Sequence, residues 1–447
     1  MEPWTNKLLR DSTLHDYTQS IMLTQHWSRE QVNIEEYFGS APYTVTEELA
    51  GTYKHNLSQF VHKKFFEEVK GFKKISESNM SSNGVAAVME DIPCDLNETF
   101  RAYSHAAIGY EDQGGLKVLV MIDREDENEI KYKIAADPIH ASLLKEWFDY
   151  SAKNNMYRGK KITAACRFLD LKEVTWADVI LPAQTIALLQ SLITMSMETR
   201  RIYKKNKLSQ KRGILLEGEP GNGKTSAIKV IVKEIPAGTS VIMAQPSHLK
   251  HSGDVRSLCQ MARDLAPSIM IIEDLDWIAE DRSHSGDAGK VIELMNQMDG
   301  VEEMDGVITI GTTNDVEKIE KAIKNRPGRF DRVIKIPNPD EDCRKRMILH
   351  FTKHWHLDKS VEVEKLVGFT DKLSGAHMGD LCLTAAHKAV MDSSWDADEK
   401  LIVKNEHFLA AVKEVKNKNY SSYLKVKGQE KGPMGFNTPR GFDYEDI

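Results

Sequence analysis

One stretch in the middle of the chain has the residue types and spacing to bind phosphate. It fits the pattern G-x-x-x-x-G-K-[ST]. Glycines in this pattern let successive backbone N–H groups turn inward around a phosphate, and a helix that starts there adds about half a positive charge. Lys224 would meet the β- and γ-phosphates, and the Thr225 hydroxyl can ligate Mg²⁺. The stretch is Gly218-Glu219-Pro220-Gly221-Asn222-Gly223-Lys224-Thr225, followed by Ser226.

The residues on either side indicate that this stretch is more than a chance glycine-rich turn. The apolar run Ile214-Leu215-Leu216 precedes it and predicts a buried strand, whereas residues 226–233 predict a helix. Strand, loop and helix in this order are the context in which the motif binds phosphate. The sequence therefore predicts a nucleotide site with ATP and Mg²⁺ as its ligands.

Two carboxylates follow a second apolar run. Glu273 and Asp274 end the stretch 268–272, and the carboxyl end of a parallel strand faces the crevice where such sheets bind ligands. Glu273 can hold a hydrated Mg²⁺, and Asp274 can polarise an attacking water. The alternative is a solvated pair at the start of a helix. Because a phosphate loop is present, we favour Mg²⁺ binding by Glu273 and polarisation of the water by Asp274. Asp276 could assist Asp274, but we favour a helix-capping role for it.

The elements that must position these residues alternate between strands and helices. Such alternation predicts an α/β domain with a parallel five-stranded sheet over residues 171–338. A helical domain over 339–418 and a flexible tail over 419–447 are expected to follow. The expected strands are the apolar runs 214–216, 240–244, 268–272, 307–310 and 333–336.

Residues 1–170 are predicted to form an α+β domain without a chemical motif. Strand-like runs at 100–110 and 116–123 flank the turn 111–115, which contains Gly114-Gly115. A third strand is expected at 129–135, and a helix at 139–153. The Ser- and Asn-rich stretch 76–84 indicates a surface loop or a break.

Composition limits the class of protein. The 447 residues include 60 Lys and Arg against 67 Asp and Glu, so the net charge of −7 argues against a surface devoted to nucleic acid. A basic cluster at 200–212 leaves nucleic-acid contact open, although a solvated face is favoured. Five scattered cysteines without a CxxC pair fit reduced thiols in the cytoplasm. Neither a membrane span nor a secretory signal is expected.

Taken together in order, the motifs resemble those of the AAA ATPases, the ring-forming motors of the P-loop class. The resemblance covers roughly residues 174–415. It implies that the segment 175–179, with Asp178, borders the adenine, and that Gly375 and Ala376 start a lid helix touching the base. Asn314, after the run 308–313, would act as sensor 1 and position the attacking water.

The resemblance also implies arginine fingers and a ring. The box 325–332 contains Arg329 and Arg332, which would reach the γ-phosphate of a neighbouring subunit, with Arg326 a weaker candidate. Fingers of this kind raise turnover by about 10³ to 10⁵ in related enzymes. The expected assembly is a homo-oligomer, a ring of six subunits. Its expected function is Mg-ATP hydrolysis coupled to remodelling or translocation of a protein client, with the N-terminal domain as adaptor.

Two departures from the family pattern keep alternatives open. The family usually has Asp and then Glu where Glu273 and Asp274 stand, so hydrolysis is expected to be slow. The aromatic and hydrophobic residues of the family's pore loop are His251 and Ser252 here, which disfavours strong processive unfolding. The alternatives are a nucleic-acid-associated ATPase that uses the basic cluster, and a nucleotide-gated scaffold that hydrolyses ATP rarely.

Overall fold

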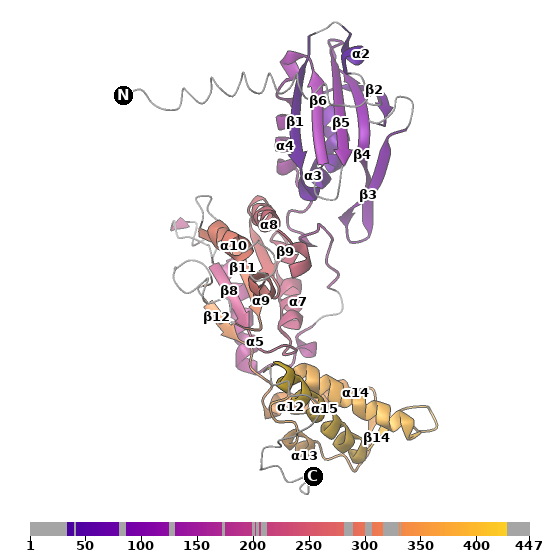
Figure 1. Ribbon diagram of the computed structural model, residues 1–447, viewed down its shortest axis with the longest axis vertical. Helices are drawn as coiled ribbons and strands as arrows, with labels where there is room; N and C mark the ends of the chain where they lie inside the picture. Colours follow the sequence, from indigo (N-terminus) through magenta and orange to yellow (C-terminus); the bar gives the residue numbers. More distant parts are fainter. Residues whose placement is uncertain are drawn as a thin grey trace.

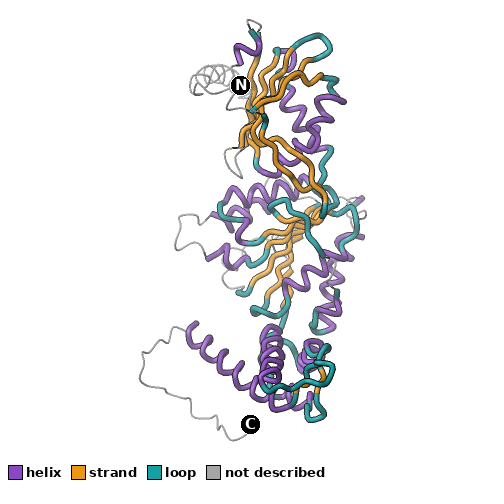
Figure 2. Tube along the Cα trace, turned by 90° about the vertical axis from the view of Figure 1, so that its right-hand side faces the viewer, coloured by secondary structure: helices purple, strands orange, loops and turns teal. Residues whose placement is uncertain are grey.

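In the computed structural model, three bodies follow one another along the long axis of the molecule: an antiparallel sheet with helices, a parallel α/β body and a helical lid (Figure 1). The two sheets lie in separate bodies, each flanked by helices (Figure 2). The structure describes residues 34–39, 42–79, 86–124, 130–171, 175–198, 202, 205–206, 212–280, 289–299, 306–315, 330 and 332–426.

The first body is built on a six-stranded antiparallel sheet of order β1-β6-β5-β4-β2, in which β3 also pairs with β4. Strand β4 is long enough to pair with β3 along its first part and with β2 along its second. The strands are β1 (Thr44–Ala50), β2 (Lys73–Ser78), β3 (Val88–Asp95), β4 (Glu98–Glu111), β5 (Lys117–Arg124) and β6 (Ile130–Ala136).

The predicted hairpin between β4 and β5 is confirmed. The Asp112 carboxylate accepts hydrogen bonds from the backbone N–H groups of Gly114 and Leu116, both at 2.8 Å, and so closes the turn. Gly115 has φ +83°, in the left-handed region that favours glycine. The strand predicted at 100–110 lies within β4, and the strands predicted at 116–123 and 129–135 each begin one residue before β5 and β6.

Two local predictions in this body need correction. Residues 76–78, expected in a loop, end strand β2, while residues 80–85 lie outside the described part of the chain. Helix α4 (Leu143–Lys153) begins later than residue 139, because Asp137 and Pro138 start a separate 3-10 turn. In that turn the Asp137 carboxylate accepts the Ile139 N–H at 3.0 Å.

The sheet packs on α3 (Thr52–Lys63), the π-helical stretch η1 (Lys64–Val69) and α4. Trp147 of α4 is fully buried among aromatic rings, and its Nε1 donates to Ser58 O at 3.1 Å. The sequence did not indicate α3, because its buried face is largely polar. Two buried tyrosines pack against that face. The Tyr132 hydroxyl is hydrogen-bonded to His55 at 2.7 Å, and the Tyr110 hydroxyl is hydrogen-bonded to His62 at 2.8 Å.

The second body contains a parallel sheet of order β12-β8-β11-β10-β9-β7. The five predicted strands are present, and β7 adds a sixth that was not expected because it has only three residues. Since β7 pairs with β9, we propose to place the domain boundary before it rather than at residue 170. The strands are β7 (Lys161–Thr163), β8 (Arg212–Glu217), β9 (Ser240–Ala244), β10 (Ser268–Ile272), β11 (Val307–Thr313) and β12 (Arg332–Lys335).

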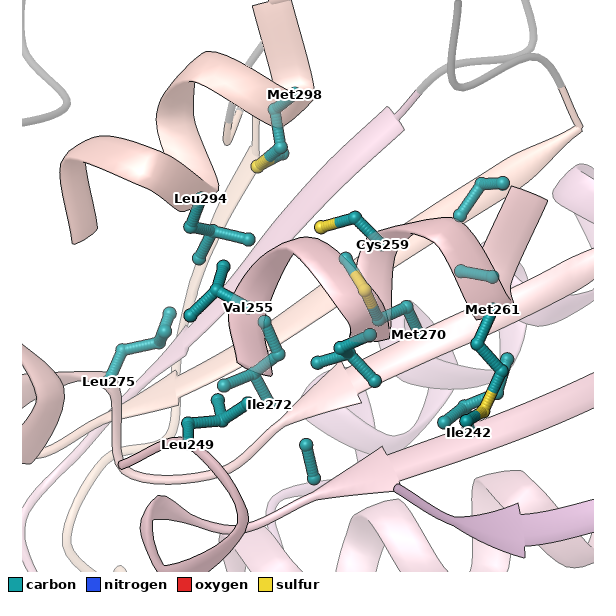
Figure 3. Close-up of a cluster of buried hydrophobic side chains, with 14 of the residues drawn as sticks. Ile242, Leu249, Val255, Cys259, Met261, Met270, Ile272, Leu275, Leu294 and Met298 are labelled. Carbon is teal, nitrogen blue, oxygen red and sulfur yellow. The ribbon is translucent and has the colours of Figure 1, made fainter. Parts of the chain in front are cut away.

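Helices cover both faces of this sheet. On one face, α8 (Ser252–Asp264) and α10 (Gly289–Asp299) pack on β9 and β10, and Figure 3 shows Val255 and Leu294 turned toward Ile272. On the other face, α5 (Ala183–Glu198) and α7 (Lys224–Glu234) cover the same strands. A sheet buried on both faces explains why its strands are continuous apolar runs.

The first two bodies are joined by a buried polar clamp. Asn56 of α3 donates to the Tyr157 hydroxyl at 2.8 Å, and Asn155 donates to the Tyr53 hydroxyl at 2.6 Å. Leu57 and Tyr157 also belong to the hydrophobic cluster that underlies α8 and β10. The connection into β7 is therefore packed against both bodies, and the first body is fixed onto the parallel sheet.

The third body is helical, as predicted, and holds a short parallel pair of strands, β13 (His356–Leu357) with β14 (Ile402–Val403). Helix α15 continues to Val426, so the start of the segment expected to be a tail from residue 419 is helical; residues 427–447 lie outside the described part. The helices are α12 (Glu341–Phe351), α13 (Val363–Gly368), α14 (Gly375–Met391) and α15 (Asn405–Val426). Within the described ranges, the helices are too short or too polar to cross a bilayer.

The clamp predicts a stability effect for Tyr157→Phe. The substitution leaves the buried Asn56 amide without its acceptor, so the free energy of unfolding should fall by about 1 to 3 kcal/mol. Urea unfolding followed by circular dichroism measures this change. Tyr150→Phe, which removes a hydroxyl from the same body, serves as control and should change stability by less than about 0.5 kcal/mol. Equal effects of both substitutions would contradict the clamp.

Burial of His62 predicts acid sensitivity. The surrounding apolar groups lower the pKa of His62 to about 3, and its Nδ1 is buried without a partner. The unfolded chain, with a pKa of about 6.5, takes up the proton first, so stability is complete above that pH and is lost as pH falls toward 3. The loss should be on the order of 1 kcal/mol per pH unit. Wild type should therefore lose stability more steeply than His62→Gln between pH 6.5 and 4.5; parallel curves would count against this assignment.

Candidate nucleotide site

The predicted phosphate loop lies between β8 and α7, and its shape requires glycine. Gly221 has φ +81° and Gly223 has φ +82°, so both are in the left-handed region. At Gly218 a side chain is excluded, because a Cβ would lie 2.5 Å from the backbone oxygen of Ile336, the residue that directly follows β12. Helix α7 starts at Lys224 directly after these turns, so its N-terminal N–H groups face the loop.

Lys224 reaches across the loop to the next strand. Its side chain is buried, and Nζ donates to the backbone oxygens of Gly218 and Glu219 at 2.5 and 3.1 Å. A third bond, 2.8 Å long, joins Nζ to Oδ1 of Asn314, which follows β11. Burial lowers the pKa of Lys224, while the carboxylates of Asp274, Asp276 and Glu219 act in the opposite direction.

Glu273 offers a carboxylate oxygen that fits a cation. Only 4 % of the residue is exposed; Oε2 accepts a bond from Gln245 Nε2 at 3.3 Å, and Oε1 is buried without any protein partner. A buried carboxylate oxygen without a donor is costly unless a cation or water approaches it. The residue therefore has the chemistry expected of a Mg²⁺ ligand, directly or through the metal's water shell.

Asp274 sits at a strained position next to Glu273. Its φ is +49°, and its N–H donates to Thr312 Oγ1 at 2.8 Å, which holds this conformation. Burial raises the pKa of Asp274, the carboxylates of Asp276 and Glu273 raise it further, and Lys224 lowers it. A strained carboxylate with a raised pKa at the end of a strand is typical of a functional position.

Asp276 bonds to Asn314 through both of its carboxylate oxygens, and Asp274 shares a side-chain hydrogen bond with Asn314 as well. It lies in the first turn of α9 (Leu275–Glu280) and is 6 % exposed. Its Oδ1 accepts the backbone N–H of Asn314 at 3.2 Å, and its Oδ2 accepts the Asn314 side-chain amide at 3.3 Å. Lys224, Asn314 and Asp276 therefore form one chain of hydrogen bonds across the ends of β8, β11 and β10, which are neighbours in the sheet.

The lid contacts the phosphate loop through Gly375 and Ala376, the two residues that were expected to touch the base. Ala376 N–H donates to Gly221 O at 2.9 Å, and Gly375 N–H donates to Asn222 Oδ1 at 3.3 Å. The approach is close, because a Cβ on Gly221 would lie 2.5 Å from the Ala376 methyl group. Pro220, Thr225 and Ser226 are exposed along this loop and the first turn of α7.

Two of the predicted residues that the structure describes, Asp178 and Arg332, are not gathered into this cluster. Asp178 is exposed and uses its carboxylate to cap its own turn, where bonds from Thr175 lower its pKa. Arg332 is exposed at the start of β12. Arg329 lies outside the described residues, as do most members of the basic cluster at 200–212.

Two supporting residues were missed by sequence reasoning. Gln245 holds Glu273, and it directly follows the predicted strand 240–244, so the same strand-end rule would have found it. Asn338 bridges the loop, accepting from Asn222 Nδ2 at 2.7 Å and donating to Glu219 Oε2 at 3.0 Å. Its position between two prolines after a predicted strand was a weaker signal.

A parallel α/β domain with this loop, the acidic strand end and a helical lid defines a P-loop nucleotide-binding protein. Residues 214–338 match the family model described as "ATPase family associated with various cellular activities (AAA)". The match confirms the predicted family: the chain carries an AAA-type P-loop ATPase domain, and this family binds nucleotides.

Known relatives match a larger part of the chain. A proteasome-activating nucleotidase of Saccharolobus solfataricus is 29 % identical over 241 residues, which cover 52 % of this chain and 61 % of that protein. A proteasome-activating nucleotidase of Methanoregula boonei is 31 % identical over 215 residues, covering 46 % of this chain and 48 % of that protein. This chain therefore spans about half to three fifths of the length of these relatives.

The fit of the lid on the loop predicts that Gly221→Ala weakens nucleotide binding. The added methyl group combines a left-handed backbone with a clash against Ala376, so the Kd of a fluorescent ATP analogue should rise about 10-fold or more. Gly238→Ala is the matched control, because Gly238 has φ +93° but open space around its Cβ position. Similar affinities in both variants would show that the clash with the lid is unimportant.

Proposed function

We propose that the chain is a Mg-ATP hydrolase that assembles into a ring and uses hydrolysis to remodel or translocate a protein or protein complex. The observation that carries this proposal is the meeting of Lys224, Asn314, Glu273 and Asp274 at the ends of three adjacent strands, beside the phosphate loop. Each of these side chains has the chemistry that phosphoryl transfer to water requires.

The residues would divide the work as follows. The loop N–H groups and Lys224 receive the β- and γ-phosphates, for which Lys224 Nζ must exchange its bond to Asn314 for one to phosphate. Thr225 and Glu273 would hold Mg²⁺, which supplies charge neutralisation at the phosphates when bound. Asp274, whose pKa is raised by burial, accepts the proton of the attacking water, and Asn314 orients that water.

The arginine fingers would come from a neighbouring subunit. Arg332 opens β12, whereas the phosphate loop follows the opposite, carboxyl end of the adjacent strand β8. A parallel pair places these ends apart, so Arg332 does not reach its own loop along this route. This arrangement favours Arg332 acting in trans, and we propose the same role for Arg329. A closed ring, of six subunits in our proposal, provides every site with a finger.

The output of hydrolysis would pass to the N-terminal body and its protein client. Gln245, which holds Glu273, follows β9, and β9 pairs with β7 beside the clamp to α3.

The base of the nucleotide would be bordered by Asp178 and by the start of the lid helix at Gly375 and Ala376. The described cysteines are free thiols, which supports a reducing compartment such as the cytoplasm. The Asp274 side chain is one methylene shorter than the usual glutamate, which favours slow ATP turnover. Slow turnover is also expected of the alternative function, a nucleotide-gated scaffold.

Asp274→Asn separates binding from hydrolysis. It removes the proton acceptor but leaves the loop intact, so phosphate release should fall about 10² to 10⁴-fold while ATP affinity stays near the wild-type value. Lys224→Ala should instead lose affinity, and Asp396→Asn, at an exposed lid turn, should behave as wild type. No magnesium-dependent phosphate release from wild type would refute the proposed activity.

A subunit-mixing experiment tests the shared site. Lys224→Ala and Arg329→Ala should each be inactive alone. In mixed rings, a pocket from an Arg329→Ala subunit can meet an intact finger from a Lys224→Ala neighbour. Random assembly of the two variants in equal amounts provides this combination at about one quarter of the sites. Turnover should therefore recover to about that fraction of wild type. No recovery, together with turnover independent of protein concentration, would rule out fingers in trans.

A further inference from the structure

We infer that Asp276 is a positioning residue that fixes the orientation of the Asn314 side chain, so that the Asn314 carbonyl oxygen points at the phosphate site. The inference rests on the proposed function, since it concerns how the same site aligns the attacking water. Sequence reasoning favoured a helix-capping role for Asp276. The structure supports a different role, because both carboxylate oxygens bond to Asn314, 38 residues further along the chain.

The orientation of an asparagine amide depends on its hydrogen-bond partners. A 180° flip of the amide exchanges the positions of its oxygen, which accepts, and its NH₂ group, which donates. Asp276 Oδ2 can only accept, so the amide nitrogen of Asn314 must face it, at 3.3 Å. The amide oxygen then faces the opposite way and accepts Lys224 Nζ at 2.8 Å. A flipped amide would set an N–H₂ group against the ammonium and leave the buried carboxylate without that donor.

The backbone is fixed by the same carboxylate. Asp276 Oδ1 accepts the Asn314 N–H at 3.2 Å, directly after the last residue of β11. One side chain therefore holds both the main chain and the amide of Asn314, and it is itself held by burial, with 6 % exposed. These two bonds, beside the side-chain hydrogen bond that Asn314 shares with Asp274, leave Asn314 little freedom to rotate.

This arrangement matters when the lysine moves. When Lys224 turns to a phosphate, it releases Asn314 Oδ1, and that oxygen remains aimed at the place the ammonium has left. A water bonded there lies between Asn314 and the phosphates. Asp276 does not contact the water in this scheme; it acts through Asn314. Misplacement of a catalytic group by about 1 Å costs about 10²-fold in rate, so the effect of losing Asp276 should appear in kcat.

The test is a double-mutant cycle on the full chain, using Asp276→Asn, Asn314→Ala and the double variant. Asp276→Asn keeps the shape and polarity of the side chain but can no longer accept both bonds. Its kcat should fall 10 to 100-fold, while the Kd for Mg-ATP stays within about 3-fold of wild type. In the Asn314→Ala background the same substitution should change kcat less than 3-fold, because the group it positions is gone.

Stability measurements separate positioning from folding. Wild type, Asp276→Asn and Asp396→Asn should all remain folded at the assay temperature, with cooperative thermal transitions; Asp396 is an aspartate that accepts two backbone bonds at an exposed lid turn. If Asp276→Asn does not fold, Asp276→Glu takes its place in the cycle, since it keeps the charge but displaces the acceptor atoms by about one methylene.

The outcomes distinguish this inference from the proposed function. An active wild type with additive losses in the cycle, with unchanged kcat in Asp276→Asn, or with kcat and ATP affinity lowered together, overturns the positioning role alone. A wild type that releases no phosphate overturns the proposed hydrolase and the positioning role with it. A selective loss of kcat that disappears in the Asn314→Ala background supports both.

Discussion

The site is organised around one buried positive charge. The Lys224 ammonium has left bulk water, and a cation in that position must be compensated by oxygen atoms. Two loop carbonyls and the Asn314 amide oxygen provide hydrogen bonds, and carboxylates of Asp274, Asp276 and Glu219 provide the opposing charge. The ends of β8, β11 and β10 must therefore be adjacent, and the sheet order makes them so.

Compensation by protein groups also makes the site responsive to ligand. A triphosphate carries more negative charge than the oxygens that hold Lys224, so its arrival would exchange the internal bonds for external ones. This exchange would directly change the hydrogen bonds of Asn314, Asp276 and the phosphate loop, because these groups bond to the lysine or to one another. A movement of the loop would also reach the lid, because the Ala376 N–H donates to the Gly221 carbonyl oxygen within the loop.

The N-terminal body is connected to this site through packed structure. The route passes from Glu273 to Gln245 at the end of β9, then to β7, and then to the Asn56–Tyr157 and Tyr53–Asn155 bonds at α3. The two bonds at α3 are short, at 2.8 and 2.6 Å, and the strands β7 and β9 are paired, so a displacement of the sheet can be transmitted to the N-terminal body as movement of a rigid body. The N-terminal body is therefore held on the parallel sheet by packing and hydrogen bonds rather than by a free linker.

The local pattern of the sequence determined the phosphate loop, the five apolar strands, the β4–β5 hairpin and the lid helices, because each depends on periodicity, turn residues or a contiguous motif. It could not determine β7, which is held by pairing with β9, or α3, whose polar face is stable only against Tyr110 and Tyr132. The partners of Asp276 and Gln245 were equally hidden, since they lie 38 and 28 residues away in sequence. Sequence spacing fixes which residues reach the ends of their strands, but the order in which strands pair, a property of the whole fold, decides which of those ends meet.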